Sequence, residues 1–89
     1  GDLTMLALMH PEDRDNARQE VKRHLQRQEP YEVQYRIFDH KRQIKYIRAR
    51  GTGVFDAQGN LLYIDGILLD VTDRVLLRQS VQRRALQFE

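Results

Sequence analysis

Residues 61–71 read LLYIDGILLDV, and this stretch decides the fold. Its apolar residues alternate between two faces, with Leu61, Tyr63, Ile67 and Leu69 on one and Leu62, Ile64 and Leu68 on the other. Such alternation is typical of a β-strand, and a strand that is apolar on both faces must be covered on both faces. We therefore expect a strand that needs more cover than one short helix can give.

Two more strands are predicted before this stretch. Residues 31–38 (YEVQYRIF) alternate cleanly between apolar and polar side chains, and residues 44–55 (IKYIRARGTGVF) form a longer extended segment. Residues 39–43 are a polar connection, and residues 56–60 (DAQGN) are a hairpin turn in which Gly59 can adopt a positive φ. The sequence therefore predicts three antiparallel strands.

A helix is predicted on each side of the strands. Pro11, followed closely by acidic residues, is a helix-start signature, and this helix should run to about Gln28 because Pro30 disfavours helical angles before it. After the last strand, Thr72 is the predicted N-cap of a second helix, with Asp73 in its first turn. Leu77, Val81, Arg84 and Phe88 are separated by 4, 3 and 4 residues, which is the spacing of a heptad repeat. This spacing favours a coiled-coil helix, although the segment is too short to establish one.

Composition limits the function classes. The chain has 89 residues, which suits one small domain, and it has no cysteine, which removes disulfides, thiolate metal sites and thiol nucleophiles. This fits a cytoplasmic protein, and no apolar run is long enough for direct membrane insertion. Lysine and arginine total 15 against 13 acids, and these bases are spread along the chain. We therefore expect no nucleic-acid partner.

No catalytic or metal-binding constellation is evident. The three histidines, His10, His24 and His40, are not spaced as the ligands of a metal site are. The acids near Pro11 are explained by the electrostatics of a helix start. We therefore predict a segment with no catalytic residues and no metal site.

The order of helix, three antiparallel strands and emergent helix resembles the PAS family in its PAC-containing branch. The resemblance is carried by residues 10–14 (HPEDR), 30–37 (PYEVQYRI), 44–47 (IKYI), 54–60 (VFDAQGN) and 66–74 (GILLDVTDR). It implies an α+β fold in which three strands of a five-stranded antiparallel sheet are visible, with one flanking helix and a C-terminal signalling helix. The family's first two strands precede the His-Pro segment, so we expect an N-terminally truncated domain. Arg42 stands in the turn where the family usually has glycine.

The resemblance also implies domains and sites. Residues 1–73 would be the C-terminal part of a PAS/PAC sensory domain, and residues 74–89 the start of a linker or signalling helix. The candidate wall of a ligand or cofactor pocket consists of Val33, Tyr35, Ile47, Ala49, Gly51, Ile64 and Gly66. The small residues Gly51, Thr52 and Gly53 either leave room there for a ligand or serve packing or a bulge. Signal relay is assigned to Asp70, Thr72 and Asp73 at the junction of strand and helix. The cofactor stays open, with haem held by His24 as a minor alternative.

The leading interpretation is a sensory signal-transduction module of a larger regulatory protein, such as a histidine kinase or diguanylate cyclase. Its expected partners are a second copy of the chain, bound by strand or segment exchange, a downstream effector domain and a small-molecule ligand. One alternative is a ligand-free PAS-like dimerisation scaffold. A second is a small basic RNA-binding domain that uses Tyr46, Arg48 and Arg50 on one sheet face.

Overall fold

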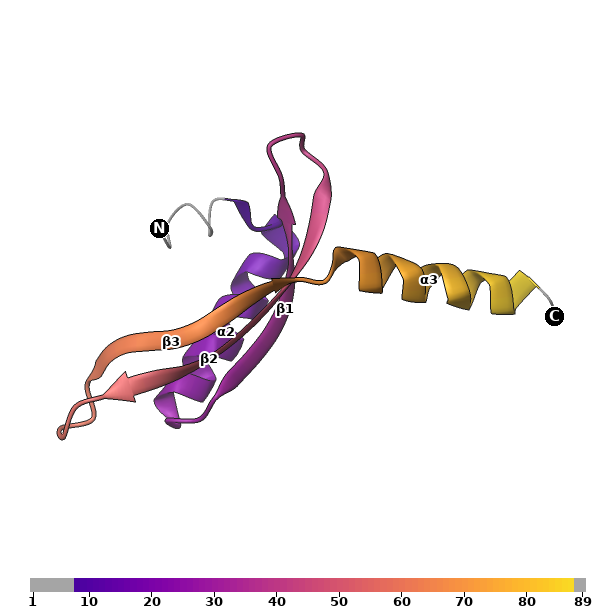
Figure 1. The fold of residues 1–89 in the computed structure, drawn as a ribbon. Coiled ribbons are helices and arrows are strands. Elements are labelled where there is room, and N and C mark those ends of the chain that lie inside the picture. The colour runs from indigo at the N-terminus through magenta and orange to yellow at the C-terminus, as the bar shows by residue number, and fades with distance from the viewer. Residues whose placement is uncertain (1–7, 88–89) are drawn as a thin grey trace.

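The computed structural model describes residues 8–87, with residues 85–87 as backbone only. The chain runs through α2 (Pro11–Gln26), β1 (Tyr31–Phe38), β2 (Ile44–Phe55), β3 (Leu61–Asp70) and α3 (Thr72–Gln87), as Figure 1 shows. The strands form one antiparallel sheet in the order β1-β2-β3. The α+β fold predicted from the sequence is therefore confirmed. Residues 1–7 of the expected domain and Phe88 of the expected heptad lie outside the described residues.

Helix α2 starts as its sequence predicts but ends earlier. Pro11 is its first residue, and the His10 Nδ1 accepts a hydrogen bond from the Glu12 N–H (3.1 Å). The helix stops before Pro30 as predicted, but two residues short of the expected end near Gln28, because Gln28 has a left-handed φ of 55°. This conformation cannot continue a right-handed helix, so the chain turns toward Pro30 after Gln26.

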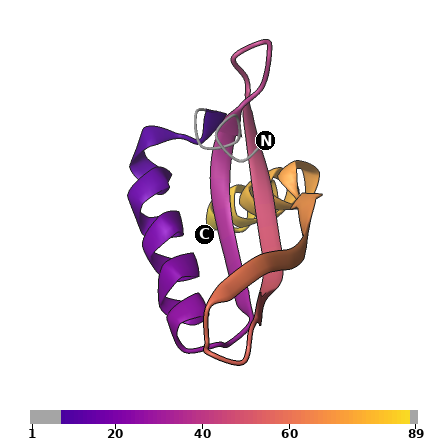
Figure 2. The same ribbon diagram turned by 90° about the vertical axis from the view of Figure 1, so that its left-hand side faces the viewer.

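The core lies between α2 and the face of the sheet that α2 covers, here called the inner face. Ala17 is the buried residue of α2, and the helix runs alongside the strands in Figure 2. The buried cluster consists of Met9, Ala17, Val33, Tyr35, Ile47 and Ala49. Val21, Tyr31 and Ile37 pack against it. The helix therefore covers the sheet mainly over β1 and the adjoining part of β2.

Strand β3 lies outside this core, and every one of its residues is exposed. Leu62, for example, has 60% of its surface exposed. The described residues supply no second neighbour for β3, which is the edge strand of the sheet. The cover that the sequence demands for this strand is therefore not provided by residues 8–87.

A bulge changes the side chains that share a face of β3. Val54 pairs with Tyr63 and Phe55 with Leu61, so Leu62 has no partner in the register. The extra residue places Leu61 on the inner face, together with Ile64. Strict alternation had predicted that Leu61 and Ile64 lie on opposite faces. That part of the predicted facing is wrong.

The two hairpin turns are both fixed by an aspartate. Asp39 Oδ1 accepts hydrogen bonds from the backbone N–H groups of residues 41 and 43 (2.8 and 2.9 Å), and Asp56 acts in the same way in the second turn. Arg42 has a φ of 60° and Gly59 a φ of 83°. Arg42 therefore adopts the left-handed conformation that glycine adopts at lower cost.

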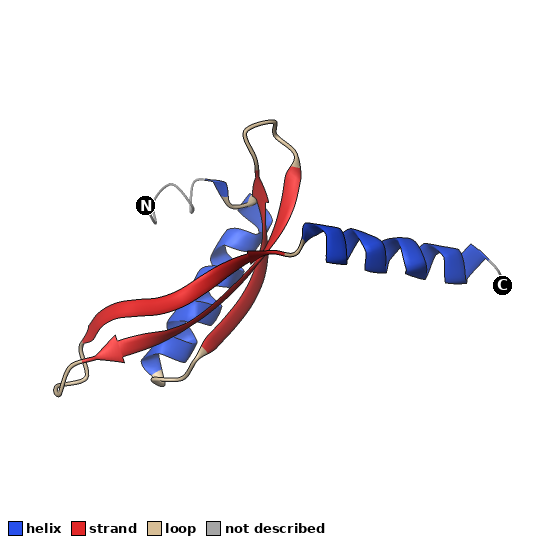
Figure 3. Ribbon diagram, viewed as in Figure 1, coloured by secondary structure: helices blue, strands red, loops and turns tan. Residues whose placement is uncertain are grey.

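Helix α3 leaves the sheet as a separate rod (Figure 3). The described molecule measures 58 × 30 × 19 Å, and α3 accounts for much of its elongated shape. Leu76, Leu77 and Val81 are exposed along it. Helix α3 is 16 residues long and packs little against the sheet, so tertiary packing contributes less to its stability than it does for α2.

Candidate functional site

An open groove of about 1300 Å³ lies between α2 and β3 on the inner face. It exists because α2 covers only part of this face and leaves the sheet beside β3 bare. Its apolar lining includes Ala17, Val21 and Leu25 from α2, Tyr35 and Ala49 from the sheet, and Leu61, Ile64 and Leu68 from β3. A large, mainly apolar hollow with a few polar groups is the usual form of a small-molecule site.

The residues predicted to form a pocket wall lie on the inner face but do not all line this groove. Tyr35, Ala49 and Ile64 line it. Val33 and Ile47 lie in the buried core beside it, paired in the register with Ala49 and Tyr35. The structure therefore brings part of the predicted wall together around one space.

The remaining two predicted wall residues, Gly51 and Gly66, face each other across β2 and β3. The space above Gly51 is filled by the Tyr31 ring, whose Cζ would lie 2.7 Å from an added Cβ. A Cβ at Gly66 would clash with the Arg50 carbonyl oxygen. Both glycines are therefore needed for close packing at this point of the sheet, rather than for room in the groove.

The groove lining includes the buried phenol of Tyr35, one of the residues predicted to form the pocket wall. Tyr35 is only 5% exposed, and its burial raises the pKa of the phenol, with nearby Tyr31 as the second cause. The hydroxyl therefore stays protonated at neutral pH and can donate a hydrogen bond. Tyr35 therefore contributes a polar hydroxyl to the sheet side of the groove.

Two cations on the rim were missed by sequence analysis. Arg18 and Lys22 of α2 line the groove, together with Asp15. Their spacing of four residues places them on one side of the helix, next to the apolar stripe of Ala17 and Val21. That spacing was the signal in the sequence, but it gains meaning only once the helix is placed on the sheet.

His24 does not line the groove. Its Nδ1 lies 2.8 Å from the Glu20 carbonyl oxygen one turn earlier, and the residue borders a separate pocket near Pro30 and Gly66. The position therefore gives no support to a haem ligand in the groove. Among residues 8–87, no cluster of three or more His, Cys, Asp or Glu side chains is arranged to hold a metal ion.

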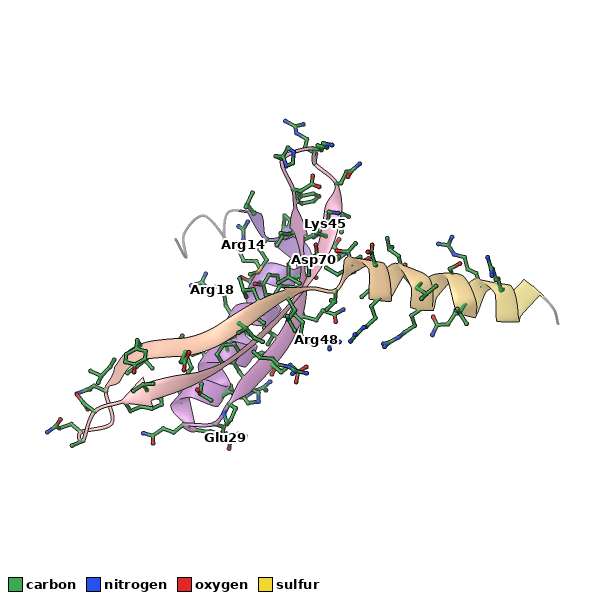
Figure 4. The ribbon with its side chains drawn as sticks, viewed as in Figure 1. Arg14, Arg18, Glu29, Lys45, Arg48 and Asp70 are labelled. Atoms are coloured by element: carbon green, nitrogen blue, oxygen red, sulfur yellow. The ribbon has the colours of Figure 1, made fainter. Side chains whose placement is uncertain are left out.

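The relay residues predicted at the end of β3 form a hydrogen-bonded junction. Asp70 Oδ1 accepts from the Thr72 N–H (3.0 Å) and from the Thr72 hydroxyl (2.5 Å). These bonds lower the pKa of Asp70, the hydroxyl bond most strongly. Asp73 is exposed in the first turn of α3. The carboxylate of Asp70 thus fixes the first residue of α3 (Figure 4).

Thr72 also binds the neighbouring strand. Its Oγ1 accepts a hydrogen bond from the Tyr46 N–H (2.9 Å), and the Tyr46 carbonyl accepts one from the Val71 N–H (2.9 Å). The Val71 carbonyl accepts the first helical bond from Val75 (3.0 Å), so Val71 holds the N-cap position. The assignment of Thr72 as N-cap is wrong, because its hydroxyl holds β2 instead of the helix terminus.

A second polar cluster fixes α2 to β1. Both carboxylate oxygens of Asp13 accept from the Arg36 guanidinium (2.9 and 2.8 Å), and one also accepts from the Arg36 N–H (2.8 Å). Glu12 contacts the same guanidinium at 3.2 Å. The Arg36 side-chain bonds hold the pKa of Asp13 below its usual value and raise that of Arg36. The acids of the helix start therefore have a tertiary role beyond the helix dipole.

Arg48 and Arg50 of β2 lie on the outer face, opposite the groove. The Nε atoms of Arg48 and Arg50 lie 3.6 and 3.4 Å from the same Glu32 oxygen. Since one carboxylate partly neutralises both cations, this face is less suited to a phosphate backbone than the sequence suggests. In the part of the chain that the structure describes, no helix has the length and apolar character to cross a membrane.

Comparison with known proteins supports this architecture. A family model described as the PAS fold matches residues 2–68. The methyl sulfide methyltransferase-associated sensor of Methanosarcina acetivorans is 29% identical over 90 residues. That match covers 98% of this chain but only 9% of the sensor, so the chain spans a small part of its curated relative.

Solved structures show the same arrangement. A sensory box histidine kinase/response regulator from Burkholderia thailandensis has a TM-score of 0.78 and 28% identity, over 92% of this chain and 64% of that one. An RNA-binding light-oxygen-voltage receptor shares the fold at 22% identity, with a TM-score of 0.68 over 97% of this chain and 26% of that one. Because the family model matches most of the chain, including α2 and the three strands, this chain belongs to the PAS-fold family.

Proposed function

We propose that this segment senses a small molecule in the inner-face groove and passes the signal through β2 to α3, within a larger regulatory protein such as a histidine kinase. A PAS domain is a sensory, non-catalytic module. The observation that carries the proposal is that the groove and the start of α3 share one strand. Ala49 lines the groove and Tyr46 holds Thr72, and both belong to β2.

The relay has a simple physical basis. A ligand that contacts Ala49 and Tyr35 would press on β2 close to Ile47, which is packed in the core. Tyr46 is the next residue, and both of its backbone hydrogen-bonding groups hold the start of α3. A small shift of β2 would therefore change the direction in which α3 leaves the sheet.

The names of two similar proteins support the proposal that this segment belongs to a larger sensory protein. The Methanosarcina relative is named as a sensor, and the Burkholderia structure is named as a sensory box histidine kinase/response regulator. In this setting α3 would connect the sensory sheet to a downstream effector domain. The exposed Leu77 and Val81 would then pack against a partner helix.

A homodimer is part of the proposal. Among residues 8–87, one edge of β3 is unpaired and its apolar side chains are exposed on both faces, and such an edge favours pairing with another chain. Strand or segment exchange with a second copy would cover it. Size-exclusion chromatography with light scattering at micromolar concentration should show a dimer, whereas a monomer would contradict this part.

Sensing is tested by amide hydrogen exchange with a ligand obtained by co-purification or screening. We expect the ligand to raise the melting temperature and to alter exchange at the start of α3. Replacing Thr72 by valine should uncouple the two effects, while Thr72→Ser, which keeps the hydroxyl, should preserve them. Stabilisation by a groove ligand with unchanged α3 exchange in the natural chain would refute the relay.

The alternative of a ligand-free dimerisation scaffold has one observation in its favour, which is the exposed β3. Under that alternative the chain dimerises with the same α3 exchange in every ligand condition. A ligand-dependent melting shift at the groove would exclude it.

A further inference from the structure

The rim of the groove carries positive charge along one side of α2. Arg14, Arg18 and Lys22 follow one another at intervals of four residues, which places them along one side of the helix. Arg14 and Arg18 project from the same side of α2 in Figure 4. Arg18 and Lys22 border the groove directly, and Asp15 is the acid in its lining.

Arg18 and Lys22 lack partners within residues 8–84, whose side chains the structure describes, and Arg14 is only partly satisfied. No hydrogen bond or ion pair engages Arg18 or Lys22 there. The Nε of Arg14 is buried without a hydrogen-bond partner, and its Nη2 reaches only the Met9 carbonyl at 3.4 Å. Like charges four residues apart on a helix repel each other, so a bound anion would relieve this repulsion.

The opposite wall of the groove is apolar. Leu61, Ile64 and Leu68 of β3 are each more than 40% exposed there. Tyr35 on the sheet side offers a protonated phenol. A small hydrophilic anion would leave the β3 wall bare, and a cationic ligand would meet charges of its own sign. An occupant that satisfies both walls has an apolar body and an anionic head.

We infer that the groove binds an amphipathic carboxylate, whose apolar body covers Ile64 and Leu68 and whose head group lies at Arg18 and Lys22. This inference rests on the proposed function, because it names the ligand class of the same groove. The charge complementarity along α2 and the bare apolar wall of β3 support it independently of the relay.

The test uses three probes with one chain length, each below its critical micelle concentration. Dodecanoate, dodecanol and dodecyltrimethylammonium are titrated into the 89-residue chain by calorimetry, and the binding site is mapped by the NMR shifts of the Ile64 and Leu68 methyl groups. We expect dodecanoate to bind at least tenfold more tightly than the ammonium probe. Its affinity should fall with added salt because the attraction is electrostatic.

Charge variants complete the test. The double variant Arg18→Gln with Lys22→Gln should weaken dodecanoate binding about tenfold and leave dodecanol binding unchanged. The matched control is Arg23→Gln with Arg27→Gln, which removes the same charge from α2 and its C-cap residue, away from the groove lining. This control should bind dodecanoate like the natural chain.

The outcomes separate the inference from the proposed function. Equal affinity for dodecanoate and dodecanol, or equal losses in both double variants, would overturn the anionic class and leave an apolar sensory groove in place. Shifts at methyl groups remote from Ile64 and Leu68 would overturn the assignment of the site. Absence of binding by every probe would overturn the inference, while the ligand-sensing function is decided separately by the exchange experiment with a co-purified or screened ligand.

Discussion

The hydrogen bond between Thr72 and β2 gives the most direct test of the junction. Thr72 is 6% exposed, and its hydroxyl both accepts from the Tyr46 N–H (2.9 Å) and donates to Asp70. Thr72→Val keeps the shape of the side chain and removes the acceptor, so the Tyr46 N–H loses its partner. Leaving a buried donor unpaired costs about 1–3 kcal/mol.

This cost is large for a small domain. With about 4–8 °C of melting temperature per kcal/mol for a domain of this size, Thr72→Val should lower the melting temperature by roughly 5–20 °C. The control is Thr72→Ser, which keeps the hydroxyl and should lose much less. Amide hydrogen exchange of Tyr46 should accelerate in the valine variant alone. If the serine and valine variants melt together, or Tyr46 exchange does not change, the hydroxyl does not hold β2.

Two further predictions concern the charges and turns of the fold. Because the folded-state pKa of Asp13 is lowered, mainly by hydrogen bonds from the Arg36 side chain, its stabilisation is present above the usual carboxyl pKa and is lost as the pH falls through the lowered value. Urea unfolding should therefore show Asp13→Asn as destabilising at neutral pH and nearly neutral in strong acid, whereas Asp15→Asn, with no ion pair among the described residues, should have a smaller effect at neutral pH. At the first turn, Arg42→Gly should raise the free energy of unfolding by about 0.5–1 kcal/mol, because glycine adopts a φ of 60° without the cost that arginine has. Lys41→Gly, beside it at a position without positive φ, should lower that free energy in the same urea assay.

The elements of the fold could be predicted from the sequence because their signals are local. The alternation in residues 31–38 and the change of period at Thr72 are both visible within a few residues. The end of α2 lies two residues earlier than predicted, and the facing of Leu61 was predicted incorrectly. Both depend on one residue leaving the regular pattern, namely Gln28 with a left-handed φ and Leu62 in a bulge.

The contacts of the candidate site could not be predicted in the same way because they join distant residues. The partner of Thr72 lies 26 residues away on β2, and that of Asp13 lies 23 residues away on β1. Gly51 was expected to leave room or to pack, and only the register shows that Tyr31 covers it. The sequence pattern identified Asp70 and Thr72 as the polar residues of the junction. Their hydrogen-bond partners could be identified only from the register of the strands.

Under the proposed function, a ligand and a second copy of the chain can bind at the same time because they contact different sides of β3. The bulge at Leu62 gathers Leu61, Ile64 and Leu68 on the groove side, and the register leaves Tyr63, Ile67 and Leu69 on the outer face. An occupant of the groove and a second copy on the outer face would therefore contact opposite sides of one strand and need not compete. Both would act on a strand that ends in Asp70, where the carboxylate fixes the start of α3. Coupling between ligand and dimer is then expected through the position of β3, and each occupant supplies part of the cover that its two apolar faces require.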